Sequence, residues 1–410
     1  MAACLALPLG ISLNSCQAGG QGSAVLWTDR PEFAFYAEYF NNAQELYRVE
    51  VRYFDSPARQ LINTKEYPDI VAGSWLKSAS TRAFFKPLDS LFKNKSFLKS
   101  DFYPRLLAMG NIDGKQYLLP VSFNAPVIVF SRDKAELLSN PFTVGFEEIK
   151  KLGKNYNSES GGVYTRMGFS PAWDSNFLFI TASLFNVSFR EASPLAWDEQ
   201  ALERAMNFAY EWTSTINSSV QAEDDFKFKY FYDPPERLVM SGRILFAHMD
   251  SDELFTLAEE WRNSLGFRWI AEGDAIPLSE NSGYMGMAKR GKSPDAARAF
   301  IYWFYEQGTQ RQFLEKSRED RSFEISFGIG GGFSALRPVT EQLFPQFYPE
   351  LLGHMPPEDH LSPPNILPWN WTALKERAIL PYLQERAHQP NADNIFSLER
   401  RIADWSRLNG

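Results

Sequence analysis

Residues 114–133 of the chain read GKQYLLPVSFNAPVIVFSRD, and this stretch decides how the rest of the sequence is interpreted. Its long apolar run, rich in Val and Phe, predicts buried strand structure. Polar residues interrupt the run at Ser122 and Asn124 and end it at Ser131. We therefore expect strand structure here, with a polar break in its middle.

Strand-like and helix-like segments alternate on the N-terminal side of this stretch. Residues 24–28 and 48–54 predict strands, an amphipathic helix is expected between them at 31–47, and 69–75 predicts a further strand. Such alternation indicates an α/β fold with parallel strand pairing. In open α/β sheets the ligand crevice lies beyond the carboxyl ends of the strands. The expected ligand positions are therefore residues 27–32, 73–75 and 122–124.

Helix-like segments are the main feature on the C-terminal side. Asp198 and Ser293 are suitable N-cap residues, and Pro294 suits a first helical position. The helices expected there span residues 198–215, 234–242, 293–317 and 394–408.

Composition limits the classes of function. At 410 residues the chain can form two or three domains or one large bilobed unit. A net charge of −8, with no stripe rich in Lys and Arg, disfavours nucleic acid as a partner. The only cysteines are Cys4 and Cys16, and the four histidines lack metal-ligand spacing, so we expect no metal site and no cofactor. Aromatic residues make up 15%, which suits ligand stacking.

Eight features along the chain, in a fixed order, resemble the extracellular solute-binding proteins of bacterial ABC importers. The resemblance is to the sugar-binding branch, which is maltose-binding-protein-like, and it covers residues 24–410. The features are a first strand ending in Trp27-Thr28, YPDIVAGSW at 67–75, FKPLDSLF at 85–92, GKQYLLP with its apolar strand at 114–133, PFTVGFEEIKKLGK at 141–154, MSGRILFAHMD at 240–250, SPDAARAFIYWFYEQGTQRQF at 293–313 and PPNILPWNW at 363–371.

This resemblance implies a two-lobed periplasmic-binding-protein (Venus-flytrap) fold with three hinge crossings and a ligand in the interlobe cleft. We expect lobe one at 24–123 plus 282–332 and lobe two at 124–281 plus 333–410. The implied function is that of a monomeric receptor that binds a small carbohydrate and delivers it to a membrane permease, without being an enzyme. By position, the crossings fall near 123–127, 279–284 and 330–336.

The first 23 residues have the pattern of a leader and tether. Residues 2–13 are apolar but too short to span a bilayer. The sequence Leu13-Asn14-Ser15-Cys16 that follows resembles a bacterial lipobox, although Asn14 replaces the usual small residue. Cys16 is thus expected to carry a lipid, with 17–23 as a flexible tether to the outer face of the cytoplasmic membrane.

A sugar-binding cleft needs aromatic faces for the rings and planar polar groups for the hydroxyls. Acids near a helix start, such as Glu32 and Asp174, also have a simpler interpretation as capping groups. We expect one of Trp369 and Trp371 in the cleft and the other packed against the body. The candidate ligand-binding residues are Trp27, Asp29, Glu32, Ser74, Trp75, Phe123, Asn124, Trp173, Asp174, Asp250, Tyr284, Trp369 and Trp371.

Several alternatives remain open. The same fold hosts non-sugar ligands such as a glycerol phosphate, a polyamine, a peptide or an iron complex. Acids in the cleft favour a cationic ligand, whereas a converging Arg82, Arg166 or Arg337 favours an anionic one. A glycosidase using Asp29 and Glu32, or an adhesin or sensor without transport, are further alternatives. The glycines at 328–332 lack a Gly-Lys-Ser/Thr ending and predict a flexible crossing rather than a phosphate loop.

Overall fold

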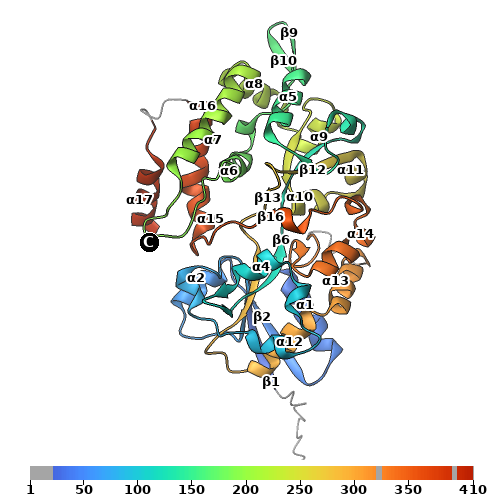
Figure 1. Ribbon diagram of the computed structural model, residues 1–410, viewed down its shortest axis with the longest axis vertical. Helices are drawn as coiled ribbons and strands as arrows, with labels where there is room; N and C mark the ends of the chain where they lie inside the picture. Colours follow the sequence, from blue (N-terminus) through green and yellow to red (C-terminus); the bar gives the residue numbers. More distant parts are fainter. Residues whose placement is uncertain (1–21, 320–325, 390–394, 410) are drawn as a thin grey trace, which may run out of the picture.

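The computed structural model describes residues 22–319, 326–389 and 395–409, which form two α/β lobes stacked along the long axis of the molecule (Figure 1). Each lobe is built around its own sheet. The expected lipid attachment point, Cys16, lies outside these residues. Within the described ranges, no helix combines the length and apolar character needed to cross a membrane.

Lobe one contains a six-stranded mixed sheet in the order β15-β6-β14-β3-β1-β2. β1 pairs in parallel with β2 and β3, as the alternating pattern predicts, whereas β14 and β15 run antiparallel to their neighbours. The small β4-β5 hairpin leads into β6. The strands are β1 (Gly22–Thr28), β2 (Tyr47–Tyr53), β3 (Ile70–Gly73), β4 (Asn111–Ile112), β5 (Lys115–Gln116), β6 (Leu119–Phe123), β14 (Gly283–Met287) and β15 (Phe333–Ser334).

The helices of lobe one show why an amphipathic pattern specifies packing. The first helix buries Phe33, Tyr36, Ala37 and Phe40, which recur at helical spacing and face the sheet and α12. Phe33 stacks on the ring of Phe304, with ring centroids 5.4 Å apart. The helices are α1 (Glu32–Ala43), α2 (Pro57–Asn63), α3 (Ala79–Arg82), α4 (Pro104–Met109), α12 (Pro294–Phe304) and α13 (Gln307–Glu319), with the short α14 (Phe344–Phe347) beside α13.

Lobe two contains a four-stranded sheet in the order β11-β7-β12-β8. Its central strand, β7, is antiparallel to both β11 and β12, and it is buried along almost its whole length. A peripheral hairpin joins β9 to β10, and β13 pairs in parallel with β16. The strands are β7 (Pro126–Ser131), β8 (Thr143–Val144), β9 (Ser158–Ser160), β10 (Val163–Arg166), β11 (Ala247–Asp250), β12 (Leu265–Ile270), β13 (Ile276–Pro277) and β16 (Leu361–Ser362).

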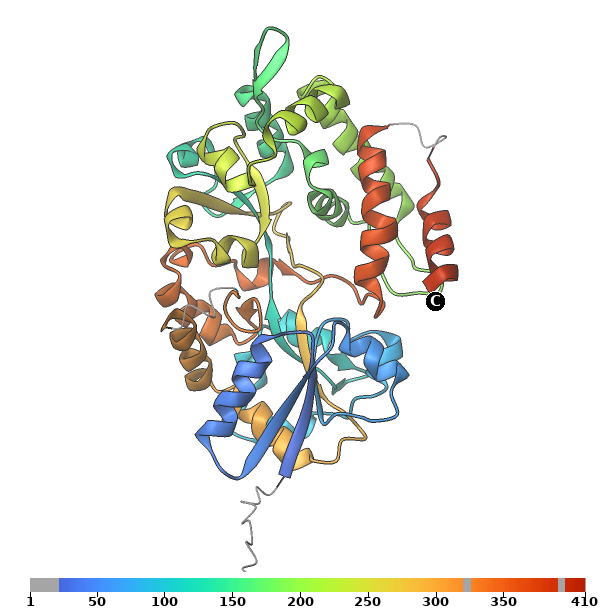
Figure 2. The same ribbon diagram turned by 180° about the vertical axis from the view of Figure 1, so that it is seen from behind.

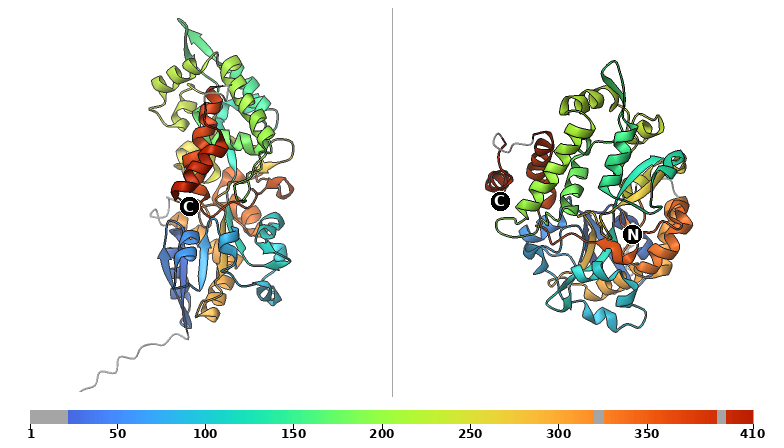
Figure 3. Two further views of the ribbon diagram at one scale, coloured as in Figure 1. Left: turned by 90° about the vertical axis from the view of Figure 1, so that its left-hand side faces the viewer. Right: turned by 45° about the horizontal axis from the view of Figure 1, so that its top comes forward.

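Helices α6, α7 and α16 pack together on one flank of lobe two, with α17 outside them (Figure 3). The Asp198 side chain caps α7 by accepting from the Ala201 N–H, as expected. Ser293 occupies the N-cap of α12 but makes no capping bond with its side chain. The helices are α5 (Phe146–Tyr156), α6 (Ser175–Leu184), α7 (Glu199–Glu211), α8 (Val220–Tyr230), α9 (Pro235–Met240), α10 (Ser251–Thr256), α11 (Glu259–Ser264), α15 (Trp371–Leu374), α16 (Leu380–His388) and α17 (Leu398–Asn409).

Connections between the lobes meet at the centre of the molecule (Figure 2). The first joins β6 to β7 through 124–125, the second joins β13 to β14 through 278–282, and the third leaves β15 towards β16. Phe333 pairs with Phe123 of β6, so β15 belongs to the sheet of lobe one. This corrects the expected assignment of all residues from 333 onward to lobe two, because the chain completes one more strand before it crosses.

Candidate functional site

Two adjoining cavities lie where the lobes meet. The larger, the lobe-two cavity, has a volume of about 630 Å³ and is lined by lobe two and its connections, with Trp75 contributed by lobe one. The smaller, the interlobe cavity, has a volume of about 490 Å³ and takes its walls from both lobes. Both volumes suit a small-molecule site. The two cavities share Trp75, Glu253, Asn281 and Thr372, so they form one cleft.

The carboxyl ends of β1 and β3 supply the wall of lobe one. One carboxylate oxygen of Asp29, just after β1, accepts from the Ser74 N–H at 3.0 Å. A Cβ at Gly73 would lie 2.5 Å from Asp29 Oδ1, so only glycine allows this approach. Burial raises the pKa of Asp29, and the Arg30 guanidinium opposes that shift.

Trp75 occupies the most unusual position in the cleft. Its φ is +62°, a left-handed conformation that bulky side chains rarely adopt. The half-buried ring lines both cavities and packs against hydrophobic clusters of both lobes. Backbone strain of this kind concentrates at ligand sites, where the surrounding structure imposes it.

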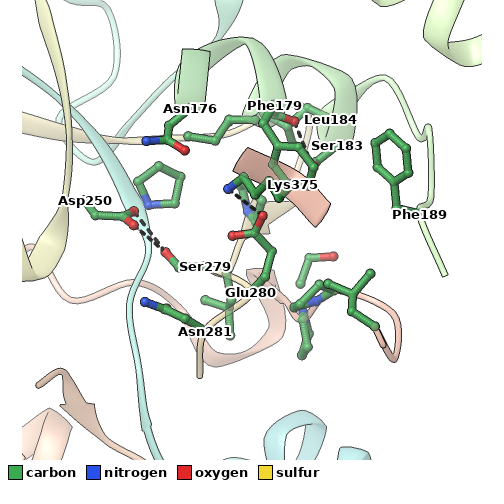
Figure 4. A pocket seen from close by; sticks show the side chains of 18 of the residues that line it. Asn176, Phe179, Ser183, Leu184, Phe189, Asp250, Ser279, Glu280, Asn281 and Lys375 are labelled. Carbon is green, nitrogen blue, oxygen red and sulfur yellow. Dashed lines mark hydrogen bonds and ion pairs between the residues drawn. The ribbon is translucent and has the colours of Figure 1, made fainter. Parts of the chain in front are cut away.

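The end of β11 supplies the opposite wall. Asp250 is the N-cap of α10 and forms a capping box with Glu253. The Ser279 hydroxyl, on the second crossing, lies 2.9 and 3.0 Å from the two carboxylate oxygens of Asp250 (Figure 4). Burial raises the pKa of Asp250 to about 7. The wall of lobe two is therefore tied directly to the hinge.

His248 and Asp174 form a buried pair beside Asp250. His248 Nδ1 lies 2.6 Å from Asp174 Oδ2, and the other Asp174 oxygen caps α6 by accepting from the Asn176 N–H. Burial opposes both charges, but the hydrogen bond and mutual attraction outweigh it, so the pKa of Asp174 falls and that of His248 rises. Asp174 thus caps a helix, as its simpler interpretation predicts, and it also lines the lobe-two cavity.

A second ion pair spans the lobe-two cavity. Lys375 Nζ lies 2.7 Å from Glu280 Oε1, and both side chains are 15% exposed (Figure 4). Lys375 Nζ also lies 4.2 Å from the ring centroid of Phe179. Phe179 and Phe189 stack at 5.7 Å, with the fully buried Trp371 behind them. The cavity therefore combines aromatic surface with charges that are already paired.

Seven of the predicted ligand-binding residues line these cavities. From lobe one the interlobe cavity receives Asp29, Glu32, Ser74 and Trp75. The lobe-two cavity receives Asp174, Asp250 and Trp371, and it also contacts Trp75.

Four other predicted residues pack in or against the hydrophobic interior and line neither cavity, which corrects the expectation for them; three are buried and Trp173 is half-buried. Trp27 is 3% exposed and packs on Phe54, with ring centroids 4.9 Å apart, because its side chain points away from the cleft into lobe one. Trp173 stacks on Phe226 at 5.5 Å. Tyr284 is buried and donates its hydroxyl to the Leu106 carbonyl, and Phe123 is likewise buried in the core.

The last two predicted residues have positions outside the cavity walls. Asn124 links the first crossing to the turn before β15 and to α10: its Nδ2 donates to the Gly331 carbonyl at 2.8 Å, and its Oδ1 accepts from the Ser251 hydroxyl. Trp369 is half-buried against the core of lobe one. Neither side chain is among the residues lining the cleft.

Arg30, His248, Glu280 and Lys375 line the cleft but were missed from the sequence. Arg30 directly follows Asp29, and His248 lies two residues before Asp250. Their positions near the ends of strands could therefore have identified them as candidates. Glu280 and Lys375 meet only through the fold. Among the described residues, no three His, Cys, Asp or Glu side chains are grouped as metal ligands would be.

Comparison with known proteins gives a family and a fold. A family profile described as bacterial extracellular solute-binding protein matches residues 36–318. An ABC substrate-binding protein from Listeria monocytogenes in complex with cycloalternan has a similar structure, at 13% identity, with 94% of this chain and 97% of that one covered and a TM-score of 0.61.

Two further solved structures have the same two-lobed fold. The first is the cyclic alpha-maltosyl-1,6-maltose binding protein from Arthrobacter globiformis, at 18% identity, with 93% of this chain and 96% of that one covered and a TM-score of 0.60. The second is maltose-bound T. maritima MalE3, at 15% identity, with 95% of this chain and 100% of that one covered and a TM-score of 0.61. No curated protein matches the chain by sequence.

Proposed function

Because the chain belongs to the bacterial extracellular solute-binding proteins, we propose that it captures a small carbohydrate between its lobes and delivers it to an ABC permease. The observation that carries this proposal is the shared wall at Trp75, where an aromatic ring meets two cavities lined by amide, hydroxyl and carboxylate groups. Such a ring suits the C–H face of a sugar, and the polar groups suit its hydroxyls. Two of the similar structures named above hold saccharides in the same fold, cycloalternan in the Listeria monocytogenes protein and maltose in T. maritima MalE3.

The proposed mechanism is closure about the three crossings. A solute that touches Asp29 or Trp75 in lobe one and Asp250 in lobe two stabilises only the conformation in which both walls are close. Differential contact of this kind shifts the population toward the closed form. The permease then recognises that form, and no bond in the solute is made or broken.

The expected anchor belongs to the same proposal. The family is extracellular, and a lipid on Cys16 would hold the receptor at the outer face of the cytoplasmic membrane next to the permease. Metabolic labelling with a fatty-acid analogue tests this, because Cys16→Ser should abolish the label.

A thermal-shift screen tests the ligand class. The chain is heated with malto- and manno-oligosaccharides, glycerol 3-phosphate, spermidine and a short peptide, since a ligand that binds only the native state raises the melting temperature. We expect a saccharide to give the largest shift and Trp75→Ala to remove it. Trp261→Ala, on α11 and lining neither cavity, is the matched control. A shift with only a non-sugar solute would contradict the proposal.

A further inference from the structure

The interlobe cavity carries a strong excess of negative charge. Its lining includes five carboxylates, Asp29, Glu32, Asp55, Asp252 and Glu253, and one basic side chain, Arg30. Arg30 is already engaged, since its Nε lies 3.6 Å from Asp29 Oδ1 and its guanidinium donates to the Ser74 hydroxyl and the Gly330 carbonyl. The lining therefore provides no further basic side chain to pair with the other four carboxylates.

Two of these carboxylates have an oxygen that needs a donor. Glu32 Oε2, on α1 of lobe one, and Asp252 Oδ1, on α10 of lobe two, are buried and accept no hydrogen bond from the described part of the chain. The other oxygen of Glu32 accepts from the Ser326 hydroxyl. Burial, followed by the nearby charge of Glu253, raises the pKa of Asp252. Leaving a buried acceptor without a hydrogen-bond donor destabilises the protein, and more strongly when the acceptor is charged.

The lobe-two cavity has a different character. Its two bases are paired internally, Lys375 with Glu280 and His248 with Asp174. Its further carboxylates are Asp250, Glu253, Glu272 and Glu376. Asp250 accepts from Ser279, Glu253 accepts from the Asp250 N–H and Glu272 accepts from the Phe146 N–H, whereas Glu376 is exposed to solvent. An uncharged, ring-shaped group against Phe179 and Trp75 suits this space better than a second cation does.

We propose that the solute is an amino sugar or an oligosaccharide bearing a basic amine, with its ammonium group in the interlobe cavity and its uncharged rings toward the lobe-two cavity. This inference rests on the proposed function. An ammonium group supplies donors for the Glu32 and Asp252 oxygens and neutralises part of the excess charge. Because those oxygens belong to opposite lobes, the same group favours closure. A uronic acid or sugar phosphate meets like charge and is rejected.

Isothermal titration calorimetry tests the inference with matched saccharides. The probes are glucosamine and its di- and trimers, galactosamine, the N-acetylated forms of each, maltotriose and spermidine. Acetylation removes the charge while keeping the ring. We expect at least one aminated saccharide to bind about tenfold or more tightly than its acetylated form, and its affinity to fall as salt screens the charge.

Charge-removing variants locate the group. Glu32→Gln and Asp252→Asn should each weaken binding of the aminated probe about tenfold and reduce its preference over the acetylated probe. Glu315→Gln, on the exposed surface of α13, makes the same charge change away from the cleft and should alter neither. Melting temperatures confirm that each variant is folded. If a variant does not fold, the salt dependence of binding to the unmodified chain still tests whether the charge of the amine contributes to affinity.

The outcomes separate this inference from the proposed function. If neutral or acetylated saccharides bind as tightly as every aminated one, the amine inference fails and the carbohydrate receptor stands. If spermidine binds and no saccharide does, both fail. If an aminated saccharide is preferred but neither Glu32→Gln nor Asp252→Asn changes that preference, the placement in the interlobe cavity is overturned.

Discussion

Trp75 combines a ring shared by both cavities with a backbone angle that disfavours any side chain. Trp75→Ala and Trp75→Gly both delete the ring, but only glycine relaxes the positive φ. We expect both variants to lose at least tenfold in saccharide affinity, with Trp75→Gly more stable than Trp75→Ala by about 1 kcal/mol. Calorimetry and urea unfolding measure the two effects. Undiminished binding by Trp75→Ala would remove this residue from the site.

Glu223 gives a pH dependence that is independent of the cleft. This carboxyl accepts from Thr213 Oγ1 at 3.1 Å and Asn217 Nδ2 at 2.6 Å, and burial raises its pKa from 4.5 to about 7. Between these values the folded state holds a proton that the unfolded chain has lost, so the free energy of unfolding falls as pH rises, by up to roughly 1.4 kcal/mol per pH unit.

Glu223→Gln should therefore flatten the fall in stability between pH 4.5 and 7, as measured by urea unfolding at several pH values. Part of the slope remains, because Asp250 also has a pKa of about 7 and contributes with the same sign. Identical slopes for the variant and the parent chain would contradict the raised pKa of Glu223.

The residue scale also shows how far the sequence alone reaches. Asp29, Trp75 and Asp250 were predicted because each directly follows or ends a strand, where open sheets present their ligand sites. Trp27 also ends a strand, yet it faces the core, because a strand's two faces alternate and the sequence does not state which face is covered. Lys375 had no signal, since its partner Glu280 meets it only in three dimensions.

At the scale of elements, a carboxylate links a loop of lobe two to a helix of lobe one. Glu191 Oε1 accepts from the Ser78 hydroxyl at 2.9 Å, and its Oε2 accepts from the Ala79 N–H at 2.7 Å, at the start of α3. Glu191 lines neither cavity, and we expect its contact to stabilise the closed conformation without touching the solute.

Glu191→Ala should therefore weaken solute binding about three- to tenfold through the closed population alone. Glu147→Ala, on the exposed face of α5, is the control for loss of a carboxylate. Calorimetry gives the affinity, and an unchanged value for Glu191→Ala would show that the contact does not bias closure.

The turn before β15 depends on a glycine conformation. Gly331 has a φ of +77°, and an added Cβ would lie 3.2 Å from Arg30 Nη1. We expect Gly331→Ala to lower the free energy of unfolding by about 1 kcal/mol or more. Gly308→Ala, inside α13 with open space around its Cβ, should instead be neutral or stabilising. Equal effects of the two substitutions in chemical denaturation would refute the conformational requirement at Gly331.

Hydrophobic periodicity predicts which segments are helices and which are strands, but it does not predict the order of the strands in the sheet. The parallel β1, β2 and β3 are adjacent in sequence, and the alternating pattern predicts their pairing. β14 returns from lobe two and β15 follows helices α12 and α13 of lobe one, and the antiparallel direction of both strands depends on these long-range paths. The lobe boundary set at 332 was early for the same reason.

For the whole molecule, the account is of two lobes whose facing walls form one cleft. The eight ordered motifs indicated the family, and the match over residues 36–318 confirms it. The excess of acids in the interlobe cavity did not follow from the net charge, because Asp252 and Glu32 come together only when the lobes are assembled.

Small-angle X-ray scattering of the chain with and without saturating saccharide tests the central claim most directly. The saccharide is the one that gives the largest thermal shift. If a solute between the lobes drives closure, the radius of gyration falls on addition to the parent chain and not on addition to Trp75→Ala. An unchanged radius of gyration at saturation would contradict the account.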